Sequence, residues 1–599
     1  MQLLSLLTVV GAFAAGSAAV KGPHAQSKRG GPKVQVLPRQ LPAEATGVQT
    51  IISPIGANIT YKEPGKEGVC ETTPGVNSYA GFINLGEDVH SFFWFFESRS
   101  DPANDPITLW LNGGPGSDSL IGLFEELGPC NVTEDLISEL NPYSWTNASN
   151  MIFLSQPIGV GFSYGSKARE LVSTLTTCTN LEKAPGSLDE FFGWYVNASS
   201  ANVTGRYPII NATAIDTTDL AAIAAWEVIQ GFYSALPQLD SKVQSTQFNL
   251  WTESYGGHYG PAFFNYFYQQ NELIKNGTTT GKALDFVNLG IINGIIDEYI
   301  QAPYYPLFAN NNTYGIKGVN DTVFNYMNFA AHMPNGCLDQ VSYCYYADQS
   351  TLGGQSVCTE AANMCRDNVE SPYYYAAGER GVYDIRHPFD DPTPPSYFVD
   401  YLNLDATREA LGVDTNYTLS NNDIYYAFQQ TGDFVYFNFI EDLEQLLNSS
   451  SVRVTLVYGD ADYICNWFGG EAVSLGAQWT HSAEFNAAGY TPFTVDGVQY
   501  GETREYGNFS FTRIYEAGHE VPYYQPIASL EFFRRSITGL DIATGKSPIN
   551  ATYGTTGDAE TTHTESFVPL PATSSSASAA STSTGSSHAP LRFMARDSY

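Results

Sequence analysis

Short apolar runs separated by turn residues recur along the chain from about residue 80. They are HSFFWFFES (90–98), PITLWLN (106–112), MIFLSQP (151–157), FNLWTES (248–254) and VRVTLVYGD (452–460). Runs of this length, rich in aromatic and β-branched residues, are typical of buried strands. The segment 219–236, DLAAIAAWEVIQGFYSAL, has apolar residues at helical spacing and predicts an amphipathic helix. Strands interleaved with helices predict an α/β fold, with a mostly parallel sheet covered by helices on both faces.

The pattern changes in three places and predicts the domain organisation. Residues 1–20 form an apolar run that ends in small residues, which is typical of a secretory signal peptide, and a membrane anchor is the alternative. Residues 21–50 lack periodicity and predict a propeptide or linker, with Lys28-Arg29 either a processing site or an ordinary basic loop. Residues 51–550 are expected to form the folded domain. Its Tyr-rich, Cys-containing part at about 300–400 is interpreted as an insertion or lid.

The C-terminal residues 551–599 are rich in Ser, Thr and Ala and predict a disordered tail. Elsewhere no stretch approaches the roughly 20 apolar residues that a membrane span needs. The chain of 599 residues carries 62 acidic and 28 basic residues, a net charge of −34. Such a surface repels nucleic acid and anionic membranes, so neither is an expected partner. The sequence leaves the oligomeric state open.

Thirteen N-x-[ST] sequons support secretion and predict a heavily glycosylated surface, outside the cell or in a vacuole. They are Asn58, Asn131, Asn147, Asn197, Asn202, Asn211, Asn276, Asn311, Asn320, Asn416, Asn448, Asn508 and Asn550.

Eight cysteines are present, and four of them form a symmetric set. Six residues separate Cys337 from Cys344, and six separate Cys358 from Cys365. Zinc is one reading, but zinc-binding pairs usually lie closer together and include histidines. In an oxidising compartment the nested disulfides Cys337–Cys365 and Cys344–Cys358 are favoured, although the sequence alone does not fix the connectivity.

The strongest chemical signal is the segment 248–257, FNLWTESYGG. A strand leads into a serine flanked by small residues and then into a helix, which is the pattern of a nucleophile elbow. Ser254 is therefore the candidate nucleophile, with Thr252 at the position where the usual G-x-S-x-G motif has its first glycine.

A serine hydroxyl needs a base, and in this topology an acid and then a histidine follow later in the chain. Asp460 and Asp462 follow the strand 452–459, and His519 lies in the loop IYEAGHEVP. The other histidines are expected to be structural or, as is expected for His563, to lie in unstructured ends. No H-E-x-x-H metal motif is present, and no metal or cofactor is expected. The glycine-rich turn 112–116, NGGPG, follows a strand upstream of the serine and is placed to supply an oxyanion hole.

Four blocks, WLNGGPG, ESYGGHY, YGDADYICNW and AGHEVP, resemble the signature segments of the serine carboxypeptidases and occur in the same order across about residues 70–540. GVCETTPGVNSYAG and GGPGSDSLIGLFEELGPC look most like the fungal carboxypeptidase S1 subgroup. The resemblance implies an α/β-hydrolase fold and hydrolysis of the C-terminal bond of peptides and proteins through an acyl-enzyme.

The resemblance also implies a role for each site residue. Ser254 is the nucleophile, His519 the general base and acid, and Asp462 orients the imidazole. The further implied roles are oxyanion N–H donation by Gly114 and Tyr255, binding of the substrate carboxylate by Asn112, Gly113, Glu126 and Glu253, and lining of the substrate pocket by Cys465, as a free thiol, and Glu520.

Two departures from the family pattern affect this reading. Ser117-Asp118 stands where many members have a cysteine, so Cys70–Cys130 is expected as a replacement disulfide and Cys178 has no evident partner. Ser155 stands where an acid is common.

Two other functions fit the same scaffold. An acyltransferase or esterase uses the same triad but has no need of the carboxylate-binding residues Asn112, Glu126 and Glu253. A catalytically inactive binding protein is disfavoured because serine, aspartate and histidine are all present. The sequence therefore predicts a serine carboxypeptidase.

Overall fold

The computed structural model describes residues 45–571, except 87–88, 168–207, 210, 377–379, 437 and 450. The signal-peptide and linker predictions for residues 1–44, and Cys178, Asn197 and Asn202, lie outside the described residues. None of the helices described is both long enough and apolar enough to cross a bilayer.

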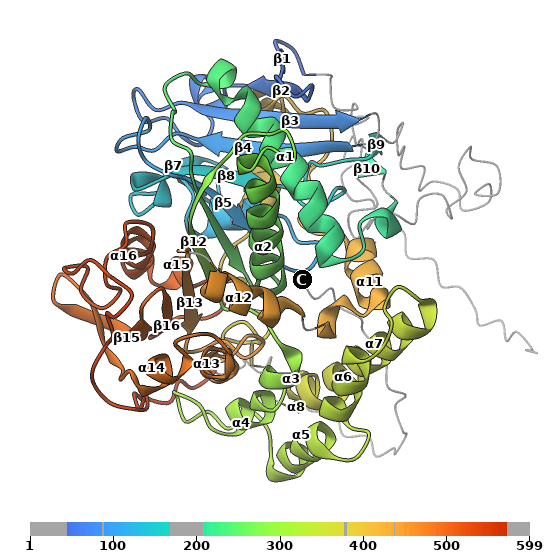
Figure 1. The fold of residues 1–599 in the computed structure, drawn as a ribbon, viewed down its shortest axis with the longest axis vertical. Coiled ribbons are helices and arrows are strands. Elements are labelled where there is room, and N and C mark those ends of the chain that lie inside the picture. The colour runs from blue at the N-terminus through green and yellow to red at the C-terminus, as the bar shows by residue number, and fades with distance from the viewer. Residues whose placement is uncertain are drawn as a thin grey trace, which may run out of the picture. The chain divides into compact units, whose positions relative to one another are not determined.

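A twelve-stranded mixed sheet forms the centre of the domain, in the order β1-β2-β3-β4-β8-β5-β11-β12-β13-β16-β15-β14 (Figure 1). The strands are β1 Gln49–Ile52, β2 Asn58–Lys62, β3 Ser78–Gly86, β4 Val89–Phe96, β5 Ile107–Leu111, β8 Asn150–Leu154, β11 Gln247–Glu253, β12 Asp285–Ile292, β13 Arg453–Gly459, β14 Thr491–Val495, β15 Val498–Tyr506 and β16 Phe509–Ile514. The run from β8 to β16 is parallel, and both flanks are antiparallel. Two small pairs lie outside it, β6 Cys130–Val132 with β7 Ser138–Leu140 and β9 Ser166–Lys167 with β10 Pro208–Ile209.

Helices cover both faces of the sheet because the strands alternate their apolar side chains between two cores. On β11, Phe248 and Leu250 pack in one core with α1 (Thr218–Leu239) and α2 (Gly256–Lys275), which lie over the sheet in Figure 1. Trp251 faces the opposite core and packs on Phe532 and Phe533 of α16 (Pro526–Ile537). The predicted α/β-hydrolase architecture is confirmed, and the predicted strands and helix match β4, β5, β8, β11, β13 and α1 in position.

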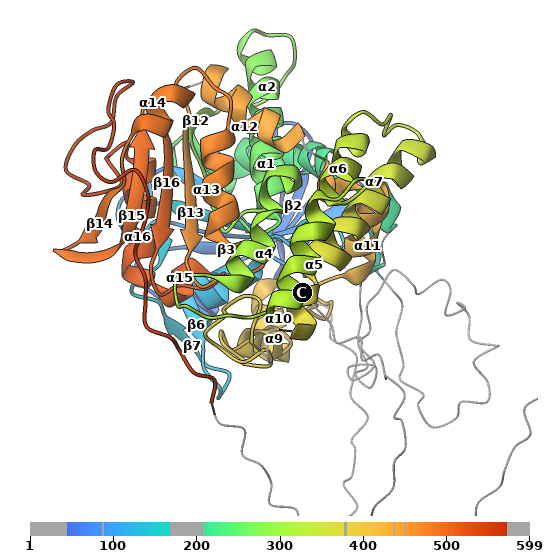
Figure 2. The ribbon, with the colours of Figure 1, turned by 90° about the horizontal axis from the view of Figure 1, so that it is seen from below.

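The remaining helices lie in two stretches. The insertion stretch holds α3 Glu298–Gln301, α4 Tyr304–Asn310, α5 Asp321–His332, α6 Cys337–Tyr345, α7 Leu352–Cys365, α8 Pro372–Ala376, α9 Tyr397–Leu402, α10 Asp405–Leu411, α11 Asn422–Thr431 and α12 Asn438–Ser449. The C-terminal stretch holds α13 Trp467–Gly476, α14 Ser482–Ala487 and α15 Val521–Tyr524. Figures 1 and 2 show α5, α6 and α7 grouped beside the sheet, with α11 next to α7.

The insertion predicted at 300–400 is thus helical. Residue pairs Cys337–Cys365 and Cys344–Cys358 join α6 to α7, and Cys70–Cys130 closes a third disulfide near β6. These are the pairings expected from the sequence. The nested pairs fasten the two helices to each other rather than to the sheet.

The first part of the predicted tail is ordered in the structure. Residues 551–571 run along the domain as an extended strap, and buried arginines hold it through its backbone. Arg504 donates to the Ala559 carbonyl at 2.6 Å, Arg513 to the His563 carbonyl at 2.8 Å, and Arg380 to the Val568 carbonyl at 2.7 Å. His563, expected in an unstructured end, stacks on Tyr515 with ring centroids 3.7 Å apart. Composition missed this because the strap is held mainly through its carbonyl groups, with Val568 as its apolar contact to the core.

One predicted glycosylation site also disagrees with the structure. Asn416 is only 5% exposed, so the folded domain leaves no room for a glycan there. By contrast, Asn58, Asn131, Asn211, Asn276 and Asn550 are exposed.

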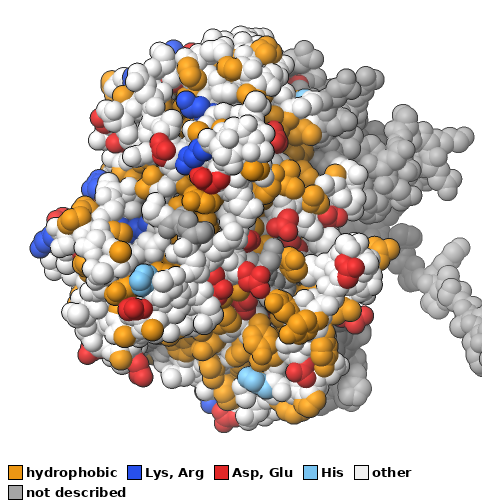
Figure 3. Space-filling model, viewed as in Figure 1, with side chains coloured by type: hydrophobic (Ala, Val, Ile, Leu, Met, Phe, Trp, Pro, Cys, Tyr) orange, Lys and Arg blue, Asp and Glu red, His pale blue; other side chains and the backbone are white. Residues whose placement is uncertain are grey.

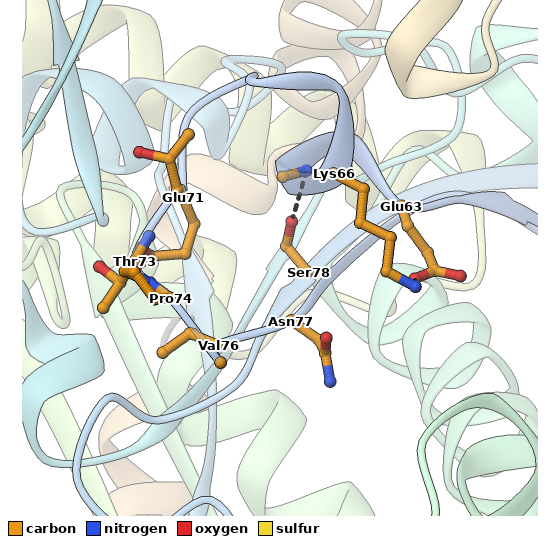
Figure 4. A pocket seen from close by; sticks show the side chains of 11 residues that line it. Glu63, Lys66, Glu71, Thr73, Pro74, Val76, Asn77 and Ser78 are labelled. Atoms are coloured by element: carbon orange, nitrogen blue, oxygen red, sulfur yellow. Dashed lines mark hydrogen bonds and ion pairs between the residues drawn. The ribbon is translucent and has the colours of Figure 1, made fainter.

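The surface is acidic, as the net charge requires. Figure 3 shows acidic side chains gathered near the middle of one face, close to where Figure 1 draws α12. Asp442 on α12 is half-buried, and burial raises the pKa of its carboxyl to about 7. A separate hollow of about 280 Å³ lies in the loop before β3, where Glu63, Lys66, Asn77 and Ser78 are among its lining residues (Figure 4). No candidate site residue lines it.

We expect the strap to be needed for stability. Truncation after Asn550 removes the carbonyl partners of three buried guanidinium groups, and each orphaned group costs about 1–3 kcal/mol. The truncated protein should therefore melt well below the full chain in a thermal unfolding experiment. Truncation after Pro571 keeps these contacts and serves as the control. Equal melting temperatures for the two truncations would contradict the assignment.

Candidate active site

Ser254 lies in a strained turn between β11 and α2. Its φ is +64°, in the left-handed region that non-glycine residues rarely adopt. The turn is held by its backbone, since Ser254 N–H donates to the Ile292 carbonyl at 3.1 Å and Ser254 C=O accepts from Ile295 N–H at 2.9 Å. A Cβ on Gly257 would lie 2.2 Å from the Ile295 carbonyl oxygen, which explains the glycine there.

Thr252 replaces the usual first glycine of the elbow without disrupting it. Its hydroxyl donates to the Gly256 carbonyl at 2.7 Å across the turn. A Cβ on Gly256 would lie 2.6 Å from the Thr252 Cβ, so the space that Thr252 occupies is provided by the absence of a side chain at Gly256. The β-branched residue thus braces the turn instead of crowding it.

His519 and Asp462 meet at the edge of the sheet where β13 and β16 end. His519 Nδ1 lies 2.7 Å from Asp462 Oδ2, and both side chains are buried. The backbone N–H of His519 donates to the Tyr383 carbonyl at 2.8 Å, and the Tyr383 ring lies against the imidazole at 4.9 Å. With Nδ1 donating to the carboxylate, Nε2 is left to accept a proton.

Asn293 also contacts this pair, and sequence reasoning missed it. It follows β12 with φ +42°, and its Nδ2 donates to Asp462 Oδ2 at 2.8 Å. Its Oδ1 accepts from Gly459 N–H at 2.9 Å, which fixes the amide orientation. The sequence offered a signal, because Asn-Gly directly follows the apolar run that forms β12, at the same sheet edge as Ser254.

Cys465 links Ser254 to the Asp462–His519 pair. It is a free, buried thiol whose sulfur lies within 4.8 Å of ligand atoms of both Asp462 and His519. The Ser254 hydroxyl interacts with this thiol, while burial and then the charge of Asp462 raise the pKa of Cys465 well above its ordinary range. The thiol therefore stays protonated. Asp462, Cys465 and His519 have the geometry to hold a thiophilic metal ion, but their present contacts need none.

The glycine turn after β5 lies directly against the elbow. A Cβ on Gly113 would lie 2.4 Å from the Tyr255 backbone nitrogen and 2.9 Å from the Ser254 Cβ. Gly114 has φ +113°, which a residue with a side chain rarely adopts. Close approach of this turn to the serine therefore requires glycine at both positions.

Asn112 joins two buried glutamates beside the serine. Its Nδ2 donates to Glu126 Oε1 at 3.1 Å and to Glu253 Oε1 at 3.2 Å. Its Oδ1 accepts from Trp110 Nε1 at 2.7 Å and from Gly122 N–H at 2.9 Å, so the amide orientation is fixed. Glu126 comes from the π-helical turn Gly122–Glu126, and Glu253 ends β11. The second oxygen of each glutamate is buried without a hydrogen-bond partner among the described residues.

The pKa values of Glu253 and Glu126 are raised, and so are those of two further carboxyl groups that extend this cluster, Glu520 and Glu125. Burial raises the pKa of Glu253 well above its usual range, and the charge of Glu126 adds to the shift. Burial likewise raises the pKa of Glu126. The pKa of Glu520 is also raised well above its usual range, first by burial and then by the charges of Glu125 and Glu126. Sequence reasoning missed Glu125. Its pKa is also raised, by burial and by the charge of Glu126. The four carboxyl groups together favour bound protons.

Asp118 accounts for the unusual Ser155. A Cβ on Gly161 would lie within 2.6 Å of both the Asp118 carboxyl and the Ser155 hydroxyl, so these two groups face each other. Burial raises the pKa of Asp118 to about 6, and its interactions with Ser155 and Tyr417 oppose the shift. A buried carboxyl group therefore lies beside Ser155, contributed by position 118.

Comparison with known proteins agrees with this geometry. A model of the serine carboxypeptidase family matches residues 64–539. Carboxypeptidase S1 homolog A of Arthroderma otae is 40% identical over 564 residues, which cover 88% of this chain and 84% of the relative. Carboxypeptidase S1 of Penicillium janthinellum is 38% identical, over 81% of this chain and 99% of the relative.

More distant relatives share the fold. A vacuolar serine-type carboxypeptidase of Saccharomyces cerevisiae is 32% identical over 85% of this chain and 87% of its own. Among solved structures, Kex1(delta)p, a prohormone-processing carboxypeptidase from the same yeast, superposes with a TM-score of 0.59 at 20% identity. That likeness covers 80% of this chain and 95% of the yeast chain.

Proposed function

We propose that this chain, which belongs to the serine carboxypeptidase family, hydrolyses the C-terminal bond of peptides through an acyl-enzyme on Ser254. The observation that carries the proposal is the His519–Asp462 hydrogen bond beside a serine in an elbow turn. His519 accepts the Ser254 proton as the hydroxyl attacks the scissile carbonyl, and then protonates the departing amino acid. A water molecule then attacks the acyl-enzyme and gives its proton to His519. His519 returns a proton to the Ser254 oxygen as the acyl group leaves. Asp462 stabilises the imidazolium that forms at each step.

The backbone N–H groups of Gly114 and Tyr255 stabilise the oxyanion in this mechanism. Asn112, Gly113, Glu126 and Glu253 bind the C-terminal carboxylate of the peptide. The glutamates serve as donors only when protonated, and their raised pKa values support that state. Exopeptidase specificity follows, because only a chain end places a carboxylate one residue beyond the scissile bond.

An acyltransferase or esterase remains the second candidate, because an acyl-enzyme is common to all three activities. The buried Glu126–Asn112–Glu253 cluster favours the peptidase, since an ester substrate has no terminal carboxylate to bind. We further propose that the protein is secreted, with a vacuolar location as the alternative. The exposed sequons support passage through the secretory pathway.

Ser254→Ala should abolish peptide hydrolysis, with a loss of about 10⁴-fold or more, because the acyl-enzyme cannot form. Release of a free amino acid from a blocked dipeptide measures activity, and labelling by a serine-directed phosphonate identifies the nucleophile. Ser117→Ala, a neighbouring buried serine outside the proposed triad, is the control and should keep its label. Labelling at another serine, or wild-type turnover of the Ser254 variant, would refute the assignment.

Peptide binding should be tight at acid pH and weaken as pH rises through the raised pKa values of the glutamate cluster. Ionised glutamates repel the substrate carboxylate, whereas protonated ones donate to it. His519 opposes this trend because it must be neutral to act as a base, so an acidic optimum results. A C-terminal amide substrate lacks the carboxylate and should favour higher pH.

The test compares kcat/KM against pH for a peptide and its amide. Glu253→Gln keeps hydrogen-bonding capacity but cannot ionise, so it should move the alkaline limb of the peptide profile only. Coincident peptide and amide profiles would show that the glutamates do not control the pH dependence.

Glu520 should favour Lys or Arg as the leaving residue, because its carboxyl lies next to His519 in the chain and a bound basic side chain would oppose its raised pKa and favour the ionised form. Glu520→Gln should lower kcat/KM for peptides ending in Lys or Arg about tenfold relative to those ending in Leu, the scale of one charge-assisted hydrogen bond. The ratio of the two kcat/KM values is the measurement. An unchanged ratio would mean that Glu520 modulates His519 alone.

A further inference from the structure

Asp433 is a buried carboxyl group that joins three segments distant in sequence. It begins the 3₁₀ turn Asp433–Val435, directly after α11, and is 4% exposed. Its Oδ1 accepts from Thr218 N–H at 2.9 Å, and its Oδ2 accepts from the Thr218 hydroxyl at 2.6 Å and the Tyr255 hydroxyl at 2.5 Å. One side chain therefore ties the start of α1 and the residue after Ser254 to this turn.

The surroundings of Asp433 suit a fixed structural bond. Thr218 is the first residue of α1, so the carboxyl lies at the positive end of the helix dipole. Burial raises the pKa of Asp433 to about 6, while the Thr218 and Tyr255 hydrogen bonds lower it. A carboxyl group this deeply buried needs all three donors, because each unpaired oxygen would carry a desolvation penalty.

Tyr255 is held from every side. Its ring is 2% exposed and packs against His258 at 4.4 Å, Phe434 at 5.1 Å and Phe428 at 6.2 Å between centroids. Its backbone nitrogen lies beside Gly113 in the glycine turn. Fixing the phenol end of Tyr255 thus limits rotation of the peptide that joins it to Ser254. That peptide needs support, because Ser254 has a left-handed backbone.

The turn that carries Asp433 rests on the disulfide-bonded helix pair α6–α7. Gly432 has φ +81°, and a Cβ there would lie 2.1 Å from the Cβ of Cys358. Cys358 is bonded to Cys344 of α6. Thr359 adds a second contact, since its hydroxyl donates to the Gln430 carbonyl at 2.8 Å at the end of α11. The helix pair therefore contacts both Gly432 and the turn that carries Asp433.

We propose that Asp433 is a positioning residue that holds the Tyr255 backbone N–H beside Ser254, with the α6–α7 pair as its support. The inference rests on the proposed function, because it assigns this N–H to the oxyanion. Asp433 touches neither substrate nor reacting atoms. It acts through the Tyr255 hydroxyl, and the helix pair acts through Gly432.

Tyr255→Phe is the cleanest test, because it removes one hydroxyl and keeps the ring and the backbone N–H. The expected result is a fall in kcat of roughly tenfold with KM within about twofold, less than the 10²–10³-fold loss of a whole oxyanion donor. Tyr233→Phe is the matched control. Tyr233 is a buried tyrosine on α1 that packs on Phe248, at the opposite end of β11 from Ser254. Its hydroxyl has no hydrogen-bond partner among the described residues, so this variant should leave kcat unchanged.

Asp433→Asn should give the same kcat defect, because its amide nitrogen cannot accept from the donors that face it. The double variant Tyr255→Phe/Asp433→Asn should be no slower than the slower single variant, since each change removes the same Tyr255–Asp433 hydrogen bond. Gly432→Ala tests the support. It should lower kcat in the same direction, because the added methyl group displaces the turn from Cys358.

Titration of Ser254 with the phosphonate measures the concentration of folded sites. It also distinguishes failure of the positioning role from failure of the proposed function. If Ser254 is labelled in all variants and kcat of Tyr255→Phe stays at the control value, the positioning role is wrong while the nucleophile stands. Additive losses in the double variant would also refute a shared bond. If Ser254 is not labelled in the wild-type protein, the proposed function itself fails.

Discussion

The parallel pairing of β5, β11, β12, β13 and β16 determines where every residue of the site can lie. Parallel strands end at the same edge of a sheet, so the turns that follow them come together in space. Asn112 follows β5, Ser254 follows β11 and Asn293 follows β12. Asp462 and His519 follow β13 and β16. The chain supplies the five positions from points up to 407 residues apart, and the register of the sheet aligns them.

This alignment requires backbone strain and buried carboxyl groups at the site, and both are stabilised by nearby contacts. Ser254 and Asn293 both have positive φ, and the site buries several carboxyl groups. Backbone hydrogen bonds stabilise the strained residues, and glycines lie where a Cβ atom would collide with neighbouring backbone atoms. The buried acids are stabilised by amides and hydroxyls, of which Asn112 is the best example, and by bound protons. Costly features that cluster at one edge of a well-packed fold are typical of a functional site.

Much of this arrangement was predictable from local sequence. Apolar runs gave the strands, the elbow pattern gave Ser254, and the order of the chain gave Asp460, Asp462 and His519 as candidates. The family resemblance then selected Asp462 over Asp460. What could not be predicted depends on contacts between distant segments. Asn293 contacts Asp462 only because β12 lies next to β13, and Asp118 lies beside Ser155 only because two loops meet. The strap after residue 550 looked disordered because its contribution is its backbone, which composition does not report.

The order of the strands along the chain has a consequence for biosynthesis. Ser254 and its glycine turns are made before Asp462 and His519, which arrive on β13 and β16 some 200 residues later. A chain that folds as it leaves the ribosome completes its N-terminal elements first. The nascent chain therefore presents Ser254 without its proposed base until the last part of the sheet is added. The order of synthesis delays completion of the proposed triad until most of the domain has been made.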